Sequence, residues 1–143
     1  MRRSGGPSDD DVDRLAALLG ALPVVSTSSD VDALPAGVIG VRAPRIDDAL
    51  LAHLAVRAPS IEYLESDGNS HVTDAGLSIL PAFTRLKWLN LEWSAISDAG
   101  LVQLAGVSSL QWVEVGGSVG VTAAGVATLR KARPDLEVEA HGL

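Results

Sequence analysis

Leu86-Lys87-Trp88-Leu89-Asn90-Leu91, followed by Ile96-Ser97-Asp98-Ala99-Gly100-Leu101, is the stretch that decides the fold, because each half of it recurs along the chain. The second half recurs at residues 72–77 and 121–126 and, more distantly, at 46–51. Its copies begin at residues 46, 72, 96 and 121, which are 26, 24 and 25 positions apart. The first half recurs in step at residues 110–115, with weaker copies at 61–66 and 36–41. Self-similarity at such a period is the sequence signature of stacked repeats.

Each copy pairs a short strand with a helix. In the strand, apolar residues alternate with polar ones, as at Leu89 and Leu91, so that one row points inward and the other to solvent. In the helix, a residue that can accept a hydrogen bond from the first turn precedes two apolar residues on one face. The expected N-cap residues are Asp47, Thr73, Ser97 and Thr122, and the apolar pairs are Leu51/Leu54, Leu77/Leu80, Leu101/Leu104 and Val126/Leu129. No single unit can bury both rows, so the units are expected to stack.

The pattern Leu86-x-x-Leu89-x-Leu91-x-x-Ser94, continued by residues 96–101, resembles the leucine-rich repeat family, in particular the cysteine-containing bacterial subtype of about 25 residues. The likeness covers roughly residues 38–138. It implies an α/β fold, a right-handed leucine-rich-repeat solenoid with a parallel β-sheet on the concave face and α-helices on the convex face. The right hand follows independently from the preference of parallel β–α–β connections. Where the family has Asn or Cys, this chain has Pro44, Asn69, Ser94 and Ser118, and a small hydroxyl there is expected to bond the backbone of the neighbouring turn.

The length of 143 residues, with 47% apolar and 20% charged side chains, is that of one globular domain with a core. We expect a flexible tail at residues 1–7, an N-terminal helical cap at 8–35, and a leucine-rich-repeat domain of about four repeats at 36–143. The cap helix is expected to start at Ser8 and to end at Pro23, with Val24-Val25 as a leading strand. Its apolar stripe comprises Val12, Leu15, Leu18, Leu19 and Leu22. The last helix ends in basic residues at 130–133, and Leu136-Glu137-Val138 is the expected closing strand.

The charge and the composition of the chain limit the kinds of partner and the cellular compartment that we expect. With 18 acidic and 11 basic side chains the net charge is −7, which argues against nucleic acid and anionic membranes and favours a protein partner with a basic surface. The lack of cysteine excludes disulfides and cysteine-ligated metals and fits a reducing compartment. The longest apolar run, residues 15–25, is broken by Gly20 and Pro23 and is too short for a bilayer, and polar residues follow the first three where a signal peptide would be apolar. We therefore expect a cytoplasmic protein.

The solvent-facing strand positions form columns, because neighbouring strands of a parallel stack lie about 4.8 Å apart. One column is expected to read Val38, Tyr63, Trp88 and Trp112, and the next Gly40, Glu65, Asn90 and Glu114. Aromatic rings beside carboxylates suit a ligand that carries Lys or Arg side chains, on the face that repeat proteins use for binding. The expected partner-binding residues are Tyr63, Glu65, Asp67, Trp88, Asn90, Glu92, Trp112 and Glu114. The remaining aromatic residues, Trp93 and Phe83, are expected at the rim of a loop and in the core.

Residues suited to catalysis are scarce, and we expect no enzyme, no cofactor and no metal site. The three histidines are isolated and lack the spacing of metal ligands. His53 is expected on a solvated helix face, His71 in a local loop hydrogen bond, and His141 in a frayed end. The glycine-rich residues 116–120 fit a tolerated loop insertion better than a phosphate cradle. The Ala-Gly pairs at 75–76, 99–100 and 124–125 indicate close packing between adjacent turns.

The main functional expectation is a non-catalytic protein–protein interaction module that binds a basic partner through its aromatic and acidic face. Cross-strand aromatic neighbours also stabilise a sheet without any ligand, so a purely structural role stays open. Small size and acidity also suit an immunity or antitoxin-like inhibitor of a basic enzyme, and a remote alternative is a hydrolase that uses His71 and Asp74. A monomer is compatible with the sequence, although open outer strands can pair with a second copy.

Overall fold

The computed structural model describes residue 17, residues 20–66 and residues 70–143. Within them, five strands form one sheet in which every neighbouring pair is parallel and the strand order follows the sequence. The strands are β1 (Gly40–Arg42), β2 (Tyr63–Glu65), β3 (Trp88–Asn90), β4 (Trp112–Glu114) and β5 (Glu137–Glu139). The α/β class and the parallel sheet expected from the sequence are therefore confirmed.

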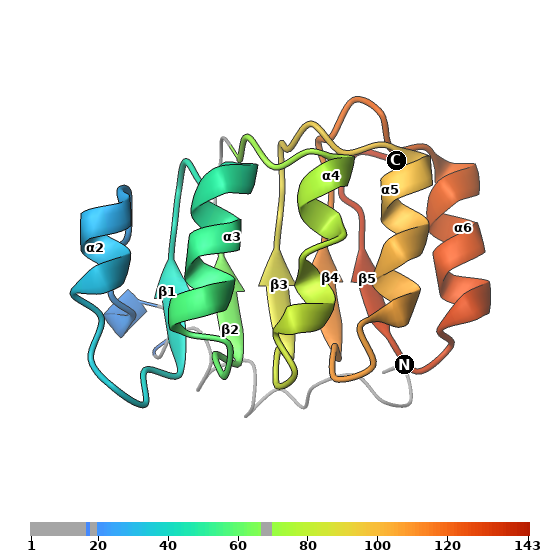
Figure 1. Cartoon of the computed structure of the whole chain (residues 1–143). Coiled ribbons are helices and arrows are strands. Elements are labelled where there is room, and N and C mark those ends of the chain that lie inside the picture. The colour runs from blue at the N-terminus through green and yellow to red at the C-terminus, as the bar shows by residue number, and fades with distance from the viewer. Residues whose placement is uncertain (1–16, 18–19, 67–69) are drawn as a thin grey trace.

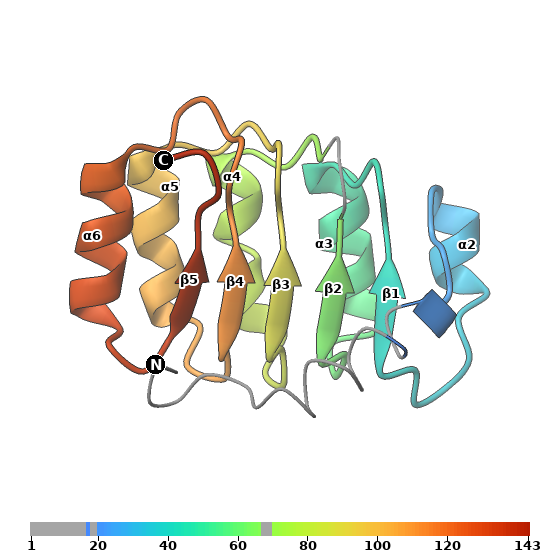
Figure 2. The ribbon, with the colours of Figure 1, turned by 180° about the vertical axis from the view of Figure 1, so that it is seen from behind.

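Helices connect successive strands and lie together on one side of the sheet (Figure 1). α2 (Ser28–Asp32) precedes β1, and the connecting helices are α3 (Asp48–Arg57), α4 (Asp74–Leu77), α5 (Asp98–Leu101) and α6 (Ala123–Ala132), with 3₁₀ turns η1 (Leu80–Ala82) and η2 (Val102–Gly106). In the reverse view the strands stand in front of these helices (Figure 2). We call the sheet face turned away from the helices the open face. None of the helices in the described part of the chain is long and apolar enough to cross a bilayer.

The core fills the space between the sheet and the helices. Leu64, Leu89 and Val113 point into it from the middle of their strands and are fully buried. The helix residues expected to face them are also buried, namely Leu51, Leu54, Leu77, Leu80, Leu101, Leu104, Val126 and Leu129. Phe83 is 1% exposed, as expected for a core residue. The apolar pattern of the sequence thus identified both layers of the core.

The predicted helix caps are confirmed at three of four positions. Asp47, Thr73 and Thr122 each accept a hydrogen bond from a first-turn N–H of their helix. The prediction is wrong for Ser97, which makes no such bond. Its hydroxyl donates to Asp74 Oδ2 at 2.5 Å, as the hydroxyls of Thr73 and Thr122 donate to their own aspartates. A hydroxyl can donate and accept at the same time, and Ser97 makes only the first of these bonds.

An aspartate ladder joins the starts of neighbouring helices. In each step, the first residue of one helix accepts two hydrogen bonds, from the backbone N–H and the hydroxyl of the next N-cap residue, at 2.5–2.9 Å. The pairs are Asp48 with Thr73, Asp74 with Ser97, and Asp98 with Thr122. A Cβ at Gly76, Gly100 or Gly125 would overlap the carboxylate of the preceding aspartate. The close packing expected at the Ala-Gly pairs is confirmed, and the aspartates are what the glycines accommodate.

A second set of buried hydroxyls links the turns after the strands. Ser94 N–H donates to Ser118 Oγ at 3.1 Å, and the Ser94 hydroxyl donates to Leu91 O at 2.8 Å. This confirms the expected bonding of small hydroxyls between neighbouring turns. The corresponding Asn69 lies outside the described residues. The nearby Ser70 is buried, and its hydroxyl accepts from Val72 N at 3.2 Å.

The register of β1 differs from the prediction. Gly40 lies beside Tyr63 and Arg42 beside Glu65, so the expected pairing of Val38 with Tyr63 and of Gly40 with Glu65 is wrong by two residues. A Cβ at Gly40 would lie 2.7 Å from Tyr63 Cβ, so only glycine fits this close approach. The closing strand is also one residue later than expected, at Glu137–Glu139 with Val138 buried.

The segment before β1 is described only in part. Of the stripe expected in the cap helix, Leu22 is buried, whereas Val12, Leu15, Leu18 and Leu19 lie outside the described residues, as does the tail at 1–7. Val24 bridges to Arg42 in parallel, as expected for a leading strand. The short α2 follows, with Thr27 and Asp30 forming a capping box.

Candidate functional site

The aromatic residues of the open face form one row across three strands. Strand register places Tyr63, Trp88 and Trp112 side by side, between Gly40 and Glu137. The rings of Trp88 and Trp112 are stacked, with centroids 3.7 Å apart and planes inclined by 17°. All three aromatic side chains are half-buried. The sequence predicted this row correctly, except that Gly40 replaces Val38 as its first member.

Carboxylates dominate the second row, two residues further along each strand. Arg42 begins the row and Glu65, Asn90, Glu114 and Glu139 follow it. Glu65, Asn90 and Glu114 are buried, with only 2–9% of each exposed. Asp67, the remaining predicted residue of β2, lies outside the described part of the chain. The expectation that this row faces solvent freely is therefore wrong for its central three members.

Asn90, in the middle of the second row, forms hydrogen bonds to two neighbouring carboxylates. Its Nδ2 donates to Glu65 Oε1 at 2.7 Å and to Glu92 Oε1 at 3.3 Å. Its Oδ1 accepts from the Glu92 N–H at 3.0 Å. The Asn90 amide gives one hydrogen bond to each of the two carboxylates and lies between their charges. Its bonds to the side chain and the backbone of Glu92 hold Glu92 at the edge of the open face.

Glu114 is the most enclosed acidic group of the open face. Its Oε1 accepts from the Gly116 N–H at 2.8 Å, and its Oε2 lies 3.0 Å from His141 Nε2. Burial raises the pKa of this carboxyl, and the negative charge of Glu92 adds to the shift, while the Gly116 N–H and His141 oppose it. His141 was expected in a frayed end, and this expectation is wrong, because the residue contacts a buried carboxylate.

One polar group of the aromatic row lacks a partner. Trp88 Nε1 is buried and makes no hydrogen bond within the structure. A buried donor without an acceptor costs about 1–3 kcal/mol, so such groups are rare in folded proteins.

His71 and Asp74, which the sequence suggested as a remote catalytic pair, do not form a catalytic arrangement. Both carboxylate oxygens of Asp74 accept from Ser97, and His71 is an exposed loop residue whose backbone N–H donates to Ile46 O at 2.8 Å. His53 Nε2 lies 2.8 Å from Asp32 Oδ1, so it pairs with α2 rather than standing in solvent alone. Among the residues that can be described, no group of three or more acidic, histidine or cysteine side chains is placed to hold a metal ion.

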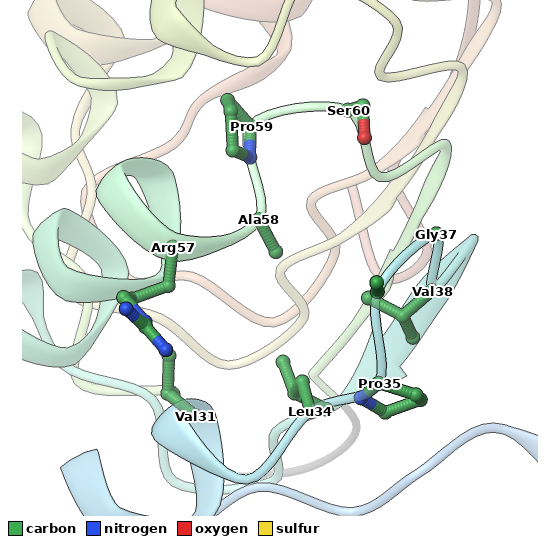
Figure 3. Close-up of a pocket in the computed structure, with 10 residues that line it drawn as sticks. Val31, Leu34, Pro35, Gly37, Val38, Arg57, Ala58, Pro59 and Ser60 are labelled. Atoms are coloured by element: carbon green, nitrogen blue, oxygen red, sulfur yellow. The ribbon is translucent and has the colours of Figure 1, made fainter.

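Among the hollows of the described part of the chain, the following two lie away from the aromatic row. One, of about 300 Å³, lies between α2, α3 and the segment before β1 (Figure 3), and its Arg57 already faces Asp32, with Nε 3.4 Å from Oδ1. The other, of about 450 Å³, lies among the loops that follow β2, β3 and β4. Trp93 lines it with 59% of its surface exposed, a φ of 59° and its indole against Gly117. The expected position of Trp93 at a loop rim is confirmed.

Sequence reasoning missed three residues of the open face: Glu137, Glu139 and His141. Glu137 and Glu139 flank Val138, so the alternation of Glu-Val-Glu was a signal that both glutamates face away from the core. No local pattern indicated His141, because its contact with Glu114 joins β4 to the residues that follow β5.

Against models of known protein families and against curated proteins, the sequence matches none.

Proposed function

We propose that this chain is a non-catalytic protein–protein interaction module that binds a basic protein through its open face. We further propose that it belongs to the leucine-rich-repeat type, as a right-handed solenoid with a helical cap at residues 8–35. The ordered parallel pairing of β1 to β5 and the aspartate ladder support a stack of equivalent units.

The observation that carries the binding proposal is the stacked pair of Trp88 and Trp112 beside carboxylates. Tryptophan is enriched in binding hot spots, and an indole face attracts the cationic groups of Lys and Arg. Glu92, Glu114, Glu137 and Glu139 lie around the pair in the strand register. Together these groups suit a basic peptide segment laid across the strands.

A purely structural role for the tryptophan stack is the main competing explanation. Neighbouring aromatic side chains on adjacent strands stabilise a sheet by about 0.2–1 kcal/mol per pair with no ligand present. The two explanations differ in their consequences, because a structural stack affects melting alone whereas a binding surface also affects affinity.

The test is to replace Trp112 by Ala and to titrate the protein with an octa-arginine peptide, with octa-glutamate as the reference peptide. We expect Trp112→Ala to weaken octa-arginine binding about tenfold or more, since aromatic anchors at interface centres carry costs of this size. Trp93→Ala is the matched control, because it removes an exposed tryptophan outside the strands. Equal affinity of wild type and Trp112→Ala, with only the melting temperature lowered, would assign the stack to stability.

The second candidate function is inhibition of a basic enzyme, in the manner of an immunity or antitoxin protein. The net charge of −7 and the concentration of glutamates on the open face favour it. A gene for a toxin-like protein next to this one would supply the candidate enzyme. Co-expression should then rescue cells from that toxin, and the Trp112→Ala chain should not.

A further inference from the structure

The part of the open face that carries Glu114 is closed over by the segment that follows β5. Residues 140–143, which we call the closing segment, form a turn in which Leu143 N–H donates to Ala140 O at 3.3 Å and Gly142 has a φ of 89°. Within it, the imidazole of His141 reaches Glu114 Oε2. The His141 side chain is 75% exposed and that of Glu114 only 2%. The histidine therefore lies on the solvent side of the carboxylate.

The closing segment packs against Gly116, two residues after the end of β4. A Cβ at Gly116 would lie 2.7 Å from both the backbone N and the backbone O of His141, and 2.9 Å from Glu114 Oε1. The main chain of His141 thus rests directly on Gly116, and a larger residue there would push it away. Gly116 and His141 offer two independent ways to disturb the same contact.

His141 contacts the same oxygen of Glu114 to which a cationic group of a partner would bind. Glu114 Oε1 is satisfied by the Gly116 N–H, which leaves Oε2 as the oxygen that faces a cation. The other charged groups around it are Glu92 after β3 and Glu139, its neighbour in register on β5. A nitrogen donor from His141 occupies the position that suits a Lys or Arg side chain.

From this arrangement we infer that the closing segment is an internal competitor of the basic partner. His141 occupies the place at Glu114 that a cationic side chain of the partner takes, and the partner binds by displacing residues 140–143. This inference rests on the proposed function of the open face. It predicts that the free protein is partly closed, so that its apparent affinity is lowered by the fraction of closed molecules.

The first experiment measures the closing segment without any partner. Carbodiimide and glycine ethyl ester label accessible carboxyl groups, and mass spectrometry reads the rate at each glutamate. We expect Glu114 to be labelled several-fold faster in His141→Ala and in Gly116→Ala than in the wild type, with Glu62 as the internal reference. His71→Ala is the matched control, since it removes an exposed histidine from a loop. Equal rates at Glu114 in all four proteins overturn the inference.

The second experiment titrates the same proteins with octa-arginine. Both His141→Ala and Gly116→Ala should bind it about threefold or more tightly than the wild type, because the closed state no longer competes. Hydrogen exchange of residues 140–143 in the wild type should rise on binding. Tight binding by the wild type with unchanged affinity in both variants overturns the closing segment but leaves the proposed function standing. No binding of octa-arginine to any of these proteins, with Glu114 labelled faster in the variants, contradicts the proposed function instead.

Discussion

Gly100 lies in the first turn of α5, where its lack of a side chain matters more than its helix propensity. Glycine ordinarily costs a helix about 0.5–1 kcal/mol relative to alanine. Here a Cβ would overlap Asp74 Oδ1, which accepts the backbone N–H of Ser97 at 2.8 Å. The residue is therefore fixed by the aspartate of the neighbouring unit and not by its own helix.

Replacing Gly100 by Ala should destabilise the protein by about 1–3 kcal/mol, the usual cost of overpacking. Adding Asp74→Ala should remove the clash, so that the double variant loses less than the sum of the two single variants. Chemical denaturation of the four proteins measures this coupling. Gly106→Ala is the matched control, because nothing lies within 4 Å of its Cβ position. Additive losses would contradict this account.

Two carboxylates of the chain respond to their surroundings in opposite directions. Burial raises the pKa of Glu114, whereas hydrogen bonds from the hydroxyl and the N–H of Thr122 lower the pKa of Asp98. The folded protein therefore holds a proton on Glu114 more tightly than the unfolded chain does, and a proton on Asp98 less tightly. The first effect lowers stability as the pH rises, and the second increases it.

Between about pH 3 and pH 7, a range that includes the titration of unperturbed carboxyl groups, Glu114 should lower the melting temperature as the pH rises and Asp98 should raise it. The difference between Glu114→Gln and the wild type should become more positive as the pH rises through the raised pKa of Glu114. The difference between Asp98→Asn and the wild type should become more negative as the pH rises from the lowered pKa toward the ordinary aspartate value. Melting curves across this range test both, and parallel shifts for the two variants would refute the assignment.

At the scale of elements, Arg133 joins the end of α6 to the end of η2. Its Nη1 donates to Val107 O at 2.9 Å and to Ala105 O at 3.4 Å, and its Nη2 donates to Leu110 O at 2.8 Å. Asp135 holds the other side of the guanidinium through two contacts of 2.9 Å. Carbonyls at the end of a helix lack partners within it, so the guanidinium supplies donors to Ala105 O and Val107 O at the end of η2. Leu110 lies further on, in the segment before β4.

Arg133→Lys should destabilise the protein by about 1–2 kcal/mol, because an ammonium cannot reproduce the planar fork of donors. Lys131→Ala, an exposed change in the last turn of the same helix, should alter stability by less than about 0.5 kcal/mol. Thermal unfolding distinguishes the two variants. An unchanged stability of Arg133→Lys would show that a positive charge at this position is sufficient and that the carbonyl contacts do not matter.

At the scale of the whole molecule, both outer strands of the sheet have partners on their outer edges. β1 is paired with the segment before it, since Arg42 N–H donates to Pro23 O and Val25 N–H donates to Arg42 O, both at 2.8 Å. On the other side, Arg130 Nη2 donates to Val138 O at 2.7 Å. Partnered carbonyls and the glutamates of β5 discourage pairing with a second copy.

The protein should therefore sediment as a monomer, and Arg130→Ala should self-associate more strongly because the Val138 carbonyl loses its donor. Sedimentation velocity over a range of concentrations measures both. Lys131→Ala again serves as the control for loss of a positive charge from α6. A wild type that already dimerises would show that these contacts do not protect the edge.

The sequence predicted the strands, the helices, three of the four cap bonds and the core, because these depend on neighbours a few residues apart. It did not predict the aspartate ladder, for example the bond from Ser97 to Asp74, since each of these bonds joins two different helices. Leu50 and Ala123 mark the two ends of the aspartate ladder in the sequence. Leu50 stands where later helices have glycine, and Ala123 stands where earlier helices have aspartate, so the aspartate ladder runs from Asp48 to Thr122.

The amino-acid pattern alone was sufficient to predict which residues face the core and which face the open side, because alternation along a strand assigns side chains to two faces. The register of β1 and the enclosure of Glu114 became evident only from the folded chain. A slip of one residue would exchange the two faces, but a slip of two leaves the alternation intact, so the pattern cannot detect it. The contact of His141 with Glu114 joins positions 27 residues apart, from 114 to 141, and depends on how the last two strands align.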